Sequence, residues 1–385
     1  QLIKAANDSH LWADTFDRQL TDLFAVESDI AQTIADRLQA KLTGSEKTLL
    51  AKKPTADPEA YELYLKGRFF WNKRTDIDLR KSVEYFNQAI AKDPNYAQAY
   101  AMVAQAWLLL PAYGGGRPAE CLPPAERAIK KALASDETCS DAHDALGILL
   151  DGFQFNFPAA EKEYHRAMQL NPNDATAHHW YGSDVCAALG DNQGEIAEMK
   201  RALELDPLSL IINTNLGVAF LHAGRLDDAI SQLRKTLEMD GSFYFARWSL
   251  GEALEYKEEF PEAMAEYQKA ISLGSDDPAA LAYSGHLLGK LGRKDEAAKV
   301  LRQLQEMSKS HYVDPYYFAL VYLGLGDREQ AISALEKSYA DHNGSNLEYI
   351  RIEPFLDPLR NEPRFQALAE KIVPAKEFRG RPSSK

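Results

Sequence analysis

The sequence predicts an all-α solenoid built from repeated helix pairs, because small residues recur along it at a nearly constant interval. Glycines recur at intervals of 34 or 35 residues, at Gly147, Gly182, Gly217, Gly251 and Gly285. Alanines recur every 34 residues at Ala229, Ala263, Ala297 and Ala331. A period of this length is typical of stacked supersecondary units. A repeat array also accounts for a chain of 385 residues, because each unit packs only on its neighbours.

Composition and charge argue against several classes of protein. The net charge is −13, from 44 basic and 57 acidic residues, whereas nucleic-acid binding needs clustered Lys and Arg. Cys121, Cys139 and Cys186 contain no Cys-x-x-Cys spacing, so neither a disulfide framework nor a zinc site is indicated. No apolar run approaches the roughly 20 residues of a membrane helix. We therefore expect no nucleic-acid partner and no membrane span in this chain.

Residues 1–42 are expected to form a small α/β segment. Residues 1–3 and 10–16 predict two strands around a polar turn, and Ile30, Ile34, Leu38 and Leu42 predict an amphipathic helix. A lone hairpin is marginally stable in water, so we expect missing partner strands upstream. The chain begins at Gln1 without an initiating Met, which we interpret as a fragment of a longer protein. Residues 43–58 are expected to form a linker.

The repeats are expected to span residues 59–342 as eight units. From Gly67 to Gly147 the distance is 80 residues, whereas two 34-residue units take 68. The largest part of this surplus falls within residues 111–124, where the composition predicts a loop that projects from one face of the solenoid.

The repeat period fades after residue 342. Residues 343–373 are expected to cap the array, with a last helix that carries Phe365, Leu368 and Ile372 on one face. The tail, residues 374–385, is basic and is expected to be disordered.

These repeated positions resemble the tetratricopeptide repeat (TPR). Trp180-Tyr181-Gly182 and Trp248-Ser249-Leu250-Gly251 match the first helix of that repeat, and Ala160, Tyr164, Ala167 and Pro172 match the second. Glycine and alanine allow two helices to approach closely while large residues fill the adjoining holes. The resemblance implies a right-handed superhelix of about eight helix pairs.

The N-terminal end is similar to the C-terminal part of a TolB-like domain. The matching residues are 10–18, 22–26 and 30–31, and residues 353–360 are similar to the usual end of proteins of that kind. The resemblance implies a bacterial signalling protein. Its effector, upstream of Gln1, would be a winged-helix regulator, an adenylate cyclase or a Ser/Thr kinase.

No motif for catalysis, metal binding or cofactor binding is found. Gly114-Gly115-Gly116 is not followed by Gly-Lys-Ser/Thr, as a phosphate-binding loop requires. His178 and His179 are adjacent and would point about 100° apart on a helix. Glu252 and Glu255 could share a helical face, as acid–base chemistry needs, but no pocket is inferable around them. We therefore expect no enzyme active site, no metal and no cofactor.

The resemblance implies that the first helices of the units line a peptide-binding groove. The candidate groove residues are Tyr61, Tyr64, Arg68, Trp71, Asp141, Asp144, His179, Leu221, His222, Phe245, Trp248, Glu252, Tyr256 and Tyr316. Aromatic side chains are common binding anchors, although several can instead pack between repeats. Only Arg68 among them is suited to a peptide carboxylate, so an apolar or basic segment is favoured.

The sequence therefore predicts a non-enzymatic scaffold that binds a protein or peptide, as the interaction or sensor arm of a signalling protein. Two alternatives remain. The chain could be the regulatory part of a cyclase, a kinase or a transcription regulator, or it could be a homo-oligomeric scaffold. The expected compartment is the cytoplasm, or the periplasm if the parent protein is anchored in a membrane.

Overall fold

The computed structural model describes residues 2–4, 9–12, 33, 54–274, 277–342 and 346–380. At its start the short strands β1 (Leu2–Lys4) and β2 (Ser9–Trp12) pair antiparallel, with Leu2 opposite Trp12. The remainder of the predicted N-terminal segment, most of the linker, and residues 381–385 of the tail lie outside the described residues. The other elements are all helical.

Helices follow one another in pairs between residues 58 and 340 of the described chain. The first four pairs are α3 (Pro58–Trp71) with α4 (Asp76–Lys92), α5 (Ala97–Leu109) with α6 (Pro118–Ser135), α7 (Ser140–Gly152) with α8 (Phe157–Leu170), and α9 (Ala175–Trp180) with α10 (Asn192–Leu205). The α9 helix continues as a π-helical stretch, η3 (Tyr181–Cys186). The next four pairs are α11 (Leu210–His222) with α12 (Leu226–Met239), α13 (Tyr244–Tyr256) with α14 (Phe260–Leu273), α15 (Pro278–Lys290) with α16 (Lys294–Met307), and α17 (Pro315–Leu325) with α18 (Arg328–Ala340).

Glycine brings the two helices of a pair together, as its spacing predicts. A Cβ atom added to Gly217 on α11 would lie 2.7 Å from Cγ of Leu233 on α12. At the equivalent position of the next pair, a Cβ on Gly251 would lie 2.5 Å from the ring of Tyr267. These distances are shorter than a van der Waals contact. The helices of each pair can therefore pack this closely only because glycine has no side chain.

A residue in the left-handed backbone conformation ends the first helix of several pairs. Gly190, Gly224, Gly292 and Gly326 occupy these turns with φ between 71° and 81°. Glu258 occupies the equivalent turn between α13 and α14 with φ of 63°. Residues with a Cβ atom disfavour the left-handed region of backbone conformation. Glu258 therefore adopts a less favourable conformation than the glycines at the equivalent turns.

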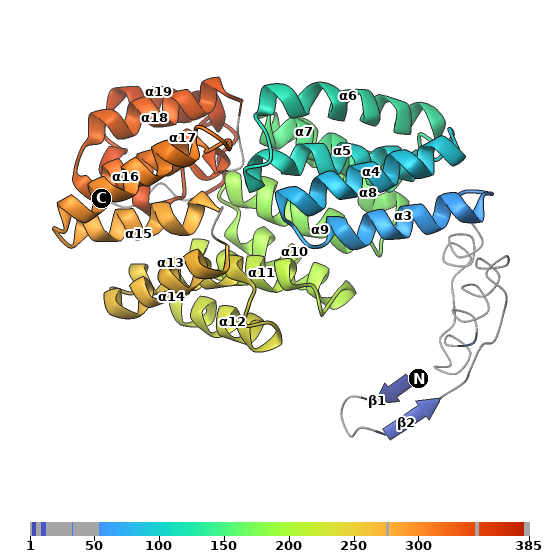
Figure 1. The fold of residues 1–385 in the computed structure, drawn as a ribbon, viewed down its shortest axis with the longest axis horizontal. Coiled ribbons are helices and arrows are strands. Elements are labelled where there is room, and N and C mark those ends of the chain that lie inside the picture. Colours follow the sequence, from blue (N-terminus) through green and yellow to red (C-terminus); the bar gives the residue numbers. More distant parts are fainter. Residues whose placement is uncertain are drawn as a thin grey trace.

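The solenoid curves until its last helices lie beside its second and third pairs (Figure 1). The ring of Phe155, which precedes α8, stacks on Tyr339 of α18 with centroids 5.5 Å apart. The first helices of the pairs therefore enclose a central space instead of lining an open groove along its whole length.

The insertion in the second pair is more ordered than its composition suggested. Residues 110–113 form the 3-10 helix η2 (Leu110–Tyr113), and α6 already begins at Pro118 and includes Pro123 and Pro124. Only residues 114–117 lie outside these helices, so the expected long loop is corrected to a short turn. Pro118 suits the first helical position because the N–H that it lacks has no intrahelical partner there.

The C-terminal end of the chain returns to the inner side of the curved solenoid. It contains η4 (Leu347–Tyr349), η5 (Pro354–Leu359) and α19 (Pro363–Ile372), and the predicted apolar face of α19 is buried. We call residues 346–362 the C-terminal segment. Beyond α19, the backbone N–H of Arg379 donates to the carbonyl of Leu189 at 2.6 Å. The tail that was expected to be disordered is therefore packed as far as residue 380.

Candidate binding site inside the solenoid

The C-terminal segment lies against the first helices of the pairs, where a bound peptide was expected. The Tyr349 hydroxyl donates to the carbonyl oxygen of Ser183 at 3.1 Å, within the π-helical stretch η3. The Tyr256 hydroxyl donates to the carboxylate of Glu353. The ring of Phe355 lies 4.6 Å from that of Tyr256. The chain itself thus occupies part of its inner surface.

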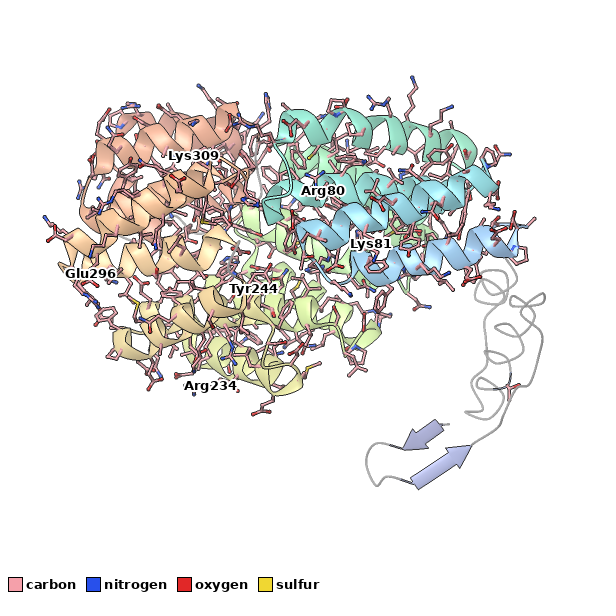
Figure 2. All side chains as sticks on the ribbon, in the orientation of Figure 1. Arg80, Lys81, Arg234, Tyr244, Glu296 and Lys309 are labelled. Atoms are coloured by element: carbon pink, nitrogen blue, oxygen red, sulfur yellow. The ribbon has the colours of Figure 1, made fainter. Side chains whose placement is uncertain are left out.

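Two adjoining cavities remain around this segment. The first, which we call the aromatic cavity, measures about 180 Å³, and its aromatic lining includes Tyr244, Phe245, Trp248, Tyr283, Tyr316 and Tyr317. The second, the carboxylate cavity, measures about 160 Å³ and is lined by Arg74, Asp151, His179, Asp184 and Glu348 among others. Tyr113, Asn215, Phe245 and Tyr349 line both. Figure 2 labels Tyr244 at the inner end of α13, in the middle of the molecule.

The aromatic cavity carries three carboxylates and no Lys or Arg among its lining residues: Glu252, Asp277 and Glu353. Burial, together with the charge of Glu353, raises the pKa of Glu252 well above its usual value. Burial also raises the pKa of Asp277 to about 6. Asp277 accepts a hydrogen bond from the backbone N–H of Ala279 at 2.7 Å, and Glu353 accepts from Tyr256 and from the backbone N–H of Phe355. A carboxylate oxygen of Glu252 lies 3.4 Å from the Tyr256 hydroxyl, whose single proton is directed to Glu353.

The carboxylate cavity contains a cation of its own. The guanidinium of Arg74 lies 3.8 Å from the ring centroid of Trp71, and its charge favours the ionised form of Asp184. Burial nevertheless raises the pKa of Asp184 to about 7, and it raises the pKa values of Asp151 and Glu348 well above the ordinary range. One oxygen of Asp151, Oδ2, has no hydrogen-bond partner among the described residues.

His179 is a neutral side chain in this cavity. Burial lowers its pKa to about 3. Its Nε2 atom lies 2.7 Å from the side-chain nitrogen of Asn215. An amide nitrogen can only donate, so Nε2 of His179 is the acceptor and carries no proton.

The structure brings together only some of the residues proposed from the sequence. Those that line the two cavities are His179, His222, Phe245, Trp248, Glu252 and Tyr316. Tyr256 lies beside them and holds Glu353 of the C-terminal segment. Leu221 is buried in the apolar core.

The candidates of the first and third pairs lie elsewhere. Tyr64 is buried against Tyr96, with ring centroids 5.2 Å apart, and Tyr61 stacks on Tyr64. Trp71 packs edge-on against Trp180. Arg68 is exposed, Asp141 is half-buried, and Asp144 is fully buried with neither carboxylate oxygen hydrogen-bonded.

Several lining residues were missed by sequence reasoning. Tyr283 and Tyr317 follow Trp248 at intervals of 35 and 34 residues, so the repeat phase could have found them. Tyr113 lies in the insertion, and Tyr349 and Glu353 lie beyond the last repeat. No periodic signal marks those three.

Among the described residues, no group of three or more His, Cys, Asp or Glu side chains is arranged to hold a metal ion. Likewise, none of the described helices combines the length and the apolar character needed to cross a membrane.

Family models described as "Tetratricopeptide repeat" match residues 185–242, 214–278 and 282–311. A solved structure with a similar fold is that of the APC/C hetero-tetramer Cut9-Hcn1. It superimposes with a TM-score of 0.54 at 18% identity and covers 90% of this chain and 60% of that chain. At that identity the likeness concerns the fold alone.

Two curated proteins are similar to parts of the sequence. "Putative adenylate cyclase 3" of Rhizobium meliloti (strain 1021) is 32% identical over 107 residues, which are 27% of this chain and 18% of that protein. The transcriptional regulator HilA of Salmonella typhimurium is 24% identical over 169 residues, 44% of this chain and 30% of HilA. This chain thus spans less than a third of either relative. Taken with the helix pairs and their close-contact glycines, the matching family models establish that the chain carries tetratricopeptide repeats in a helical solenoid.

Proposed function

We propose that this chain is a non-enzymatic scaffold that binds a protein or peptide on the inner surface of its solenoid. The observation that carries the proposal is the seating of the C-terminal segment. Tyr256 and Ser183 hold it by hydrogen bonds, and the ring of Phe355 lies 4.3 Å from that of His286. The inner helices therefore already hold a peptide segment, through rings and polar groups together.

The partner segment is proposed to be apolar or basic. Rings and carboxylates dominate the inner surface around Trp248 and Glu252, and they favour such a segment over an acidic one. A partner would reach this surface by replacing part of the C-terminal segment or by binding next to it. Nucleic acid is not a proposed partner.

The test uses a partner identified by crosslinking to the full chain and then purified. Trp248→Ala is expected to weaken its binding about tenfold or more, because buried aromatic anchors contribute about 2 kcal/mol. Arg234→Ala is the matched control, since Arg234 is exposed on the outer helix α12 (Figure 2). Both variants should keep the helical circular dichroism of the parent. Equal affinities for the two variants would contradict binding at the inner surface.

A second proposal is that the chain is the regulatory arm of a larger signalling protein. The similarity to part of an adenylate cyclase and to part of a transcriptional regulator favours it. A related proposal, which rests on the resemblance of residues 10–18, 22–26 and 30–31, is that residues 1–42 end a TolB-like domain. The codons upstream of Gln1 test both. A cyclase, kinase or winged-helix domain followed by further strands is expected there, and an unrelated open reading frame would contradict the proposal.

A further inference from the structure

The aromatic cavity is lined by carboxylates, and no Lys or Arg side chain in its lining neutralises them. Eight of its lining side chains are Tyr, Phe or Trp, and three are carboxylates. The rings of Phe245 and Trp248 lie 4.8 Å apart, and Tyr283 stacks on Trp248 at 5.1 Å. Carboxylates are rarely left in such an apolar setting without a positively charged partner.

The adjoining carboxylate cavity shows how the chain itself meets this requirement. There the Arg74 guanidinium lies over the ring of Trp71 and close enough to Asp184 to influence its charge. A cation that lies over an aromatic ring, with a carboxylate nearby, is therefore already part of this interior. The lining of the aromatic cavity has rings and carboxylates but no Lys or Arg, and its histidine, His222, is paired with Glu195 at 2.8 Å.

We propose that the aromatic cavity binds a small organic cation with an aliphatic ammonium group. Tyr283 stacks on one face of Trp248, so the cation would lie against the remaining ring surface of the eight aromatic lining residues. Aromatic cages recognise quaternary ammonium ligands in this way. A bound cation favours the ionised forms of Glu252 and Asp277, which then supply the opposite charge. An anion would be repelled by both, and a neutral apolar molecule would leave both carboxylates without a cation.

The size of the cavity limits the ligand. A cavity of roughly 150 Å³ can hold a molecule the size of benzene, and the aromatic cavity measures about 180 Å³. A ligand of about the size of choline fits this volume, whereas a folded peptide does not. This inference goes beyond the proposed scaffold function and does not depend on it.

The experiment is calorimetric titration of the full chain with choline and with 3,3-dimethyl-1-butanol, its neutral isostere. Choline is expected to bind at least tenfold more tightly. Two further arms, 1,4-diaminobutane and a lysine-containing peptide, distinguish a free ammonium compound from a protein side chain as the source of the group. If the isostere binds as tightly as choline, or if no ammonium probe binds, the proposal is overturned.

Variants locate the site. Glu252→Gln keeps the shape of the side chain and is expected to lower the affinity for the ammonium probe about tenfold. Trp248→Leu is expected to lower it at least as much. Glu296→Gln on the outer helix α16 (Figure 2) is the matched control and should leave the affinity unchanged. Should Trp248→Leu fail to fold, Glu252→Gln alone decides, because unchanged affinity in that variant refutes the assignment.

Discussion

The aromatic cavity and the carboxylate cavity adjoin each other and share Tyr113, Phe245 and Tyr349, yet they treat buried charge differently. The carboxylate cavity is built largely from the first four pairs and neutralises its acids in part with Arg74. The aromatic cavity is built largely from the last four pairs and surrounds its acids with rings. The carboxylate cavity is therefore stabilised by the chain itself, whereas the aromatic cavity is suited to an external cation.

The largest expected effect is the removal of the internal cation. Arg74→Met should destabilise the protein by about 1–3 kcal/mol, because it removes both the positive charge that favours ionised Asp184 and the contact of the guanidinium with the ring of Trp71. Urea denaturation followed by circular dichroism measures the change. A second substitution, Asp184→Asn, should recover part of the loss. A loss in the single variant of less than about 1 kcal/mol would contradict the role of Arg74.

The opposite result is expected in the aromatic cavity without a ligand. Glu252→Gln should stabilise the protein at pH 8 by about 1 kcal/mol or more, since it replaces a buried carboxylate whose pKa burial raises by a neutral amide. The same denaturation experiment measures it, with Glu296→Gln as the exposed control. If Glu252→Gln destabilised the protein at this pH, the carboxylate would have to be satisfied by the chain itself.

The pH dependence of stability should contain opposing contributions from two groups within the carboxylate cavity. The folded-state pKa of Asp184 is raised to about 7. The folded chain therefore retains a proton that the unfolded chain has lost, and stability falls as pH rises from about 4 to 7. The pKa of His179 is lowered to about 3. The unfolded chain therefore binds a proton first, and stability falls as pH decreases below about 6.5.

Melting temperatures between pH 4 and pH 8 test this assignment. Asp184→Asn removes the contribution that falls with rising pH, so its melting temperature should rise with pH by several degrees relative to the parent. His179→Gln removes the contribution that falls with decreasing pH, so its melting temperature should fall with rising pH relative to the parent. Parallel curves for the parent and both variants would show that other groups control the pH dependence.

The smallest expected effects concern two turn residues that have a positive φ, Glu258 and Phe155. Glu258→Gly should stabilise the protein by up to about 1 kcal/mol, because glycine adopts a positive φ without a steric penalty. Phe155 also has a positive φ, 52°, but its ring stacks on Tyr339. Phe155→Gly should therefore be destabilising overall. Equal shifts of melting temperature in the two variants would contradict a structural role for the Phe155 contact.

Much of the architecture was predictable because repeats encode local contacts. Gly217 and Leu233 are 16 residues apart, and their contact recurs in neighbouring pairs, so a fixed period reveals it. The same period placed Phe245, Trp248 and Glu252 on the inner helices. Tyr283 and Tyr317 follow the same period, but they were not among the predicted groove residues.

The sequence by itself determined the helix pairs, their phase and the inner position of Phe245 and Trp248, since each follows from contacts between near neighbours in the chain. Only the tertiary structure decided that the ring closes, that Phe155 meets Tyr339, and that Tyr349 and Glu353 enter the interior. The curvature of a solenoid is the sum of small rotations between repeats. No single unit encodes that sum, so the contacts between distant pairs, and the two cavities they enclose, appear only in three dimensions.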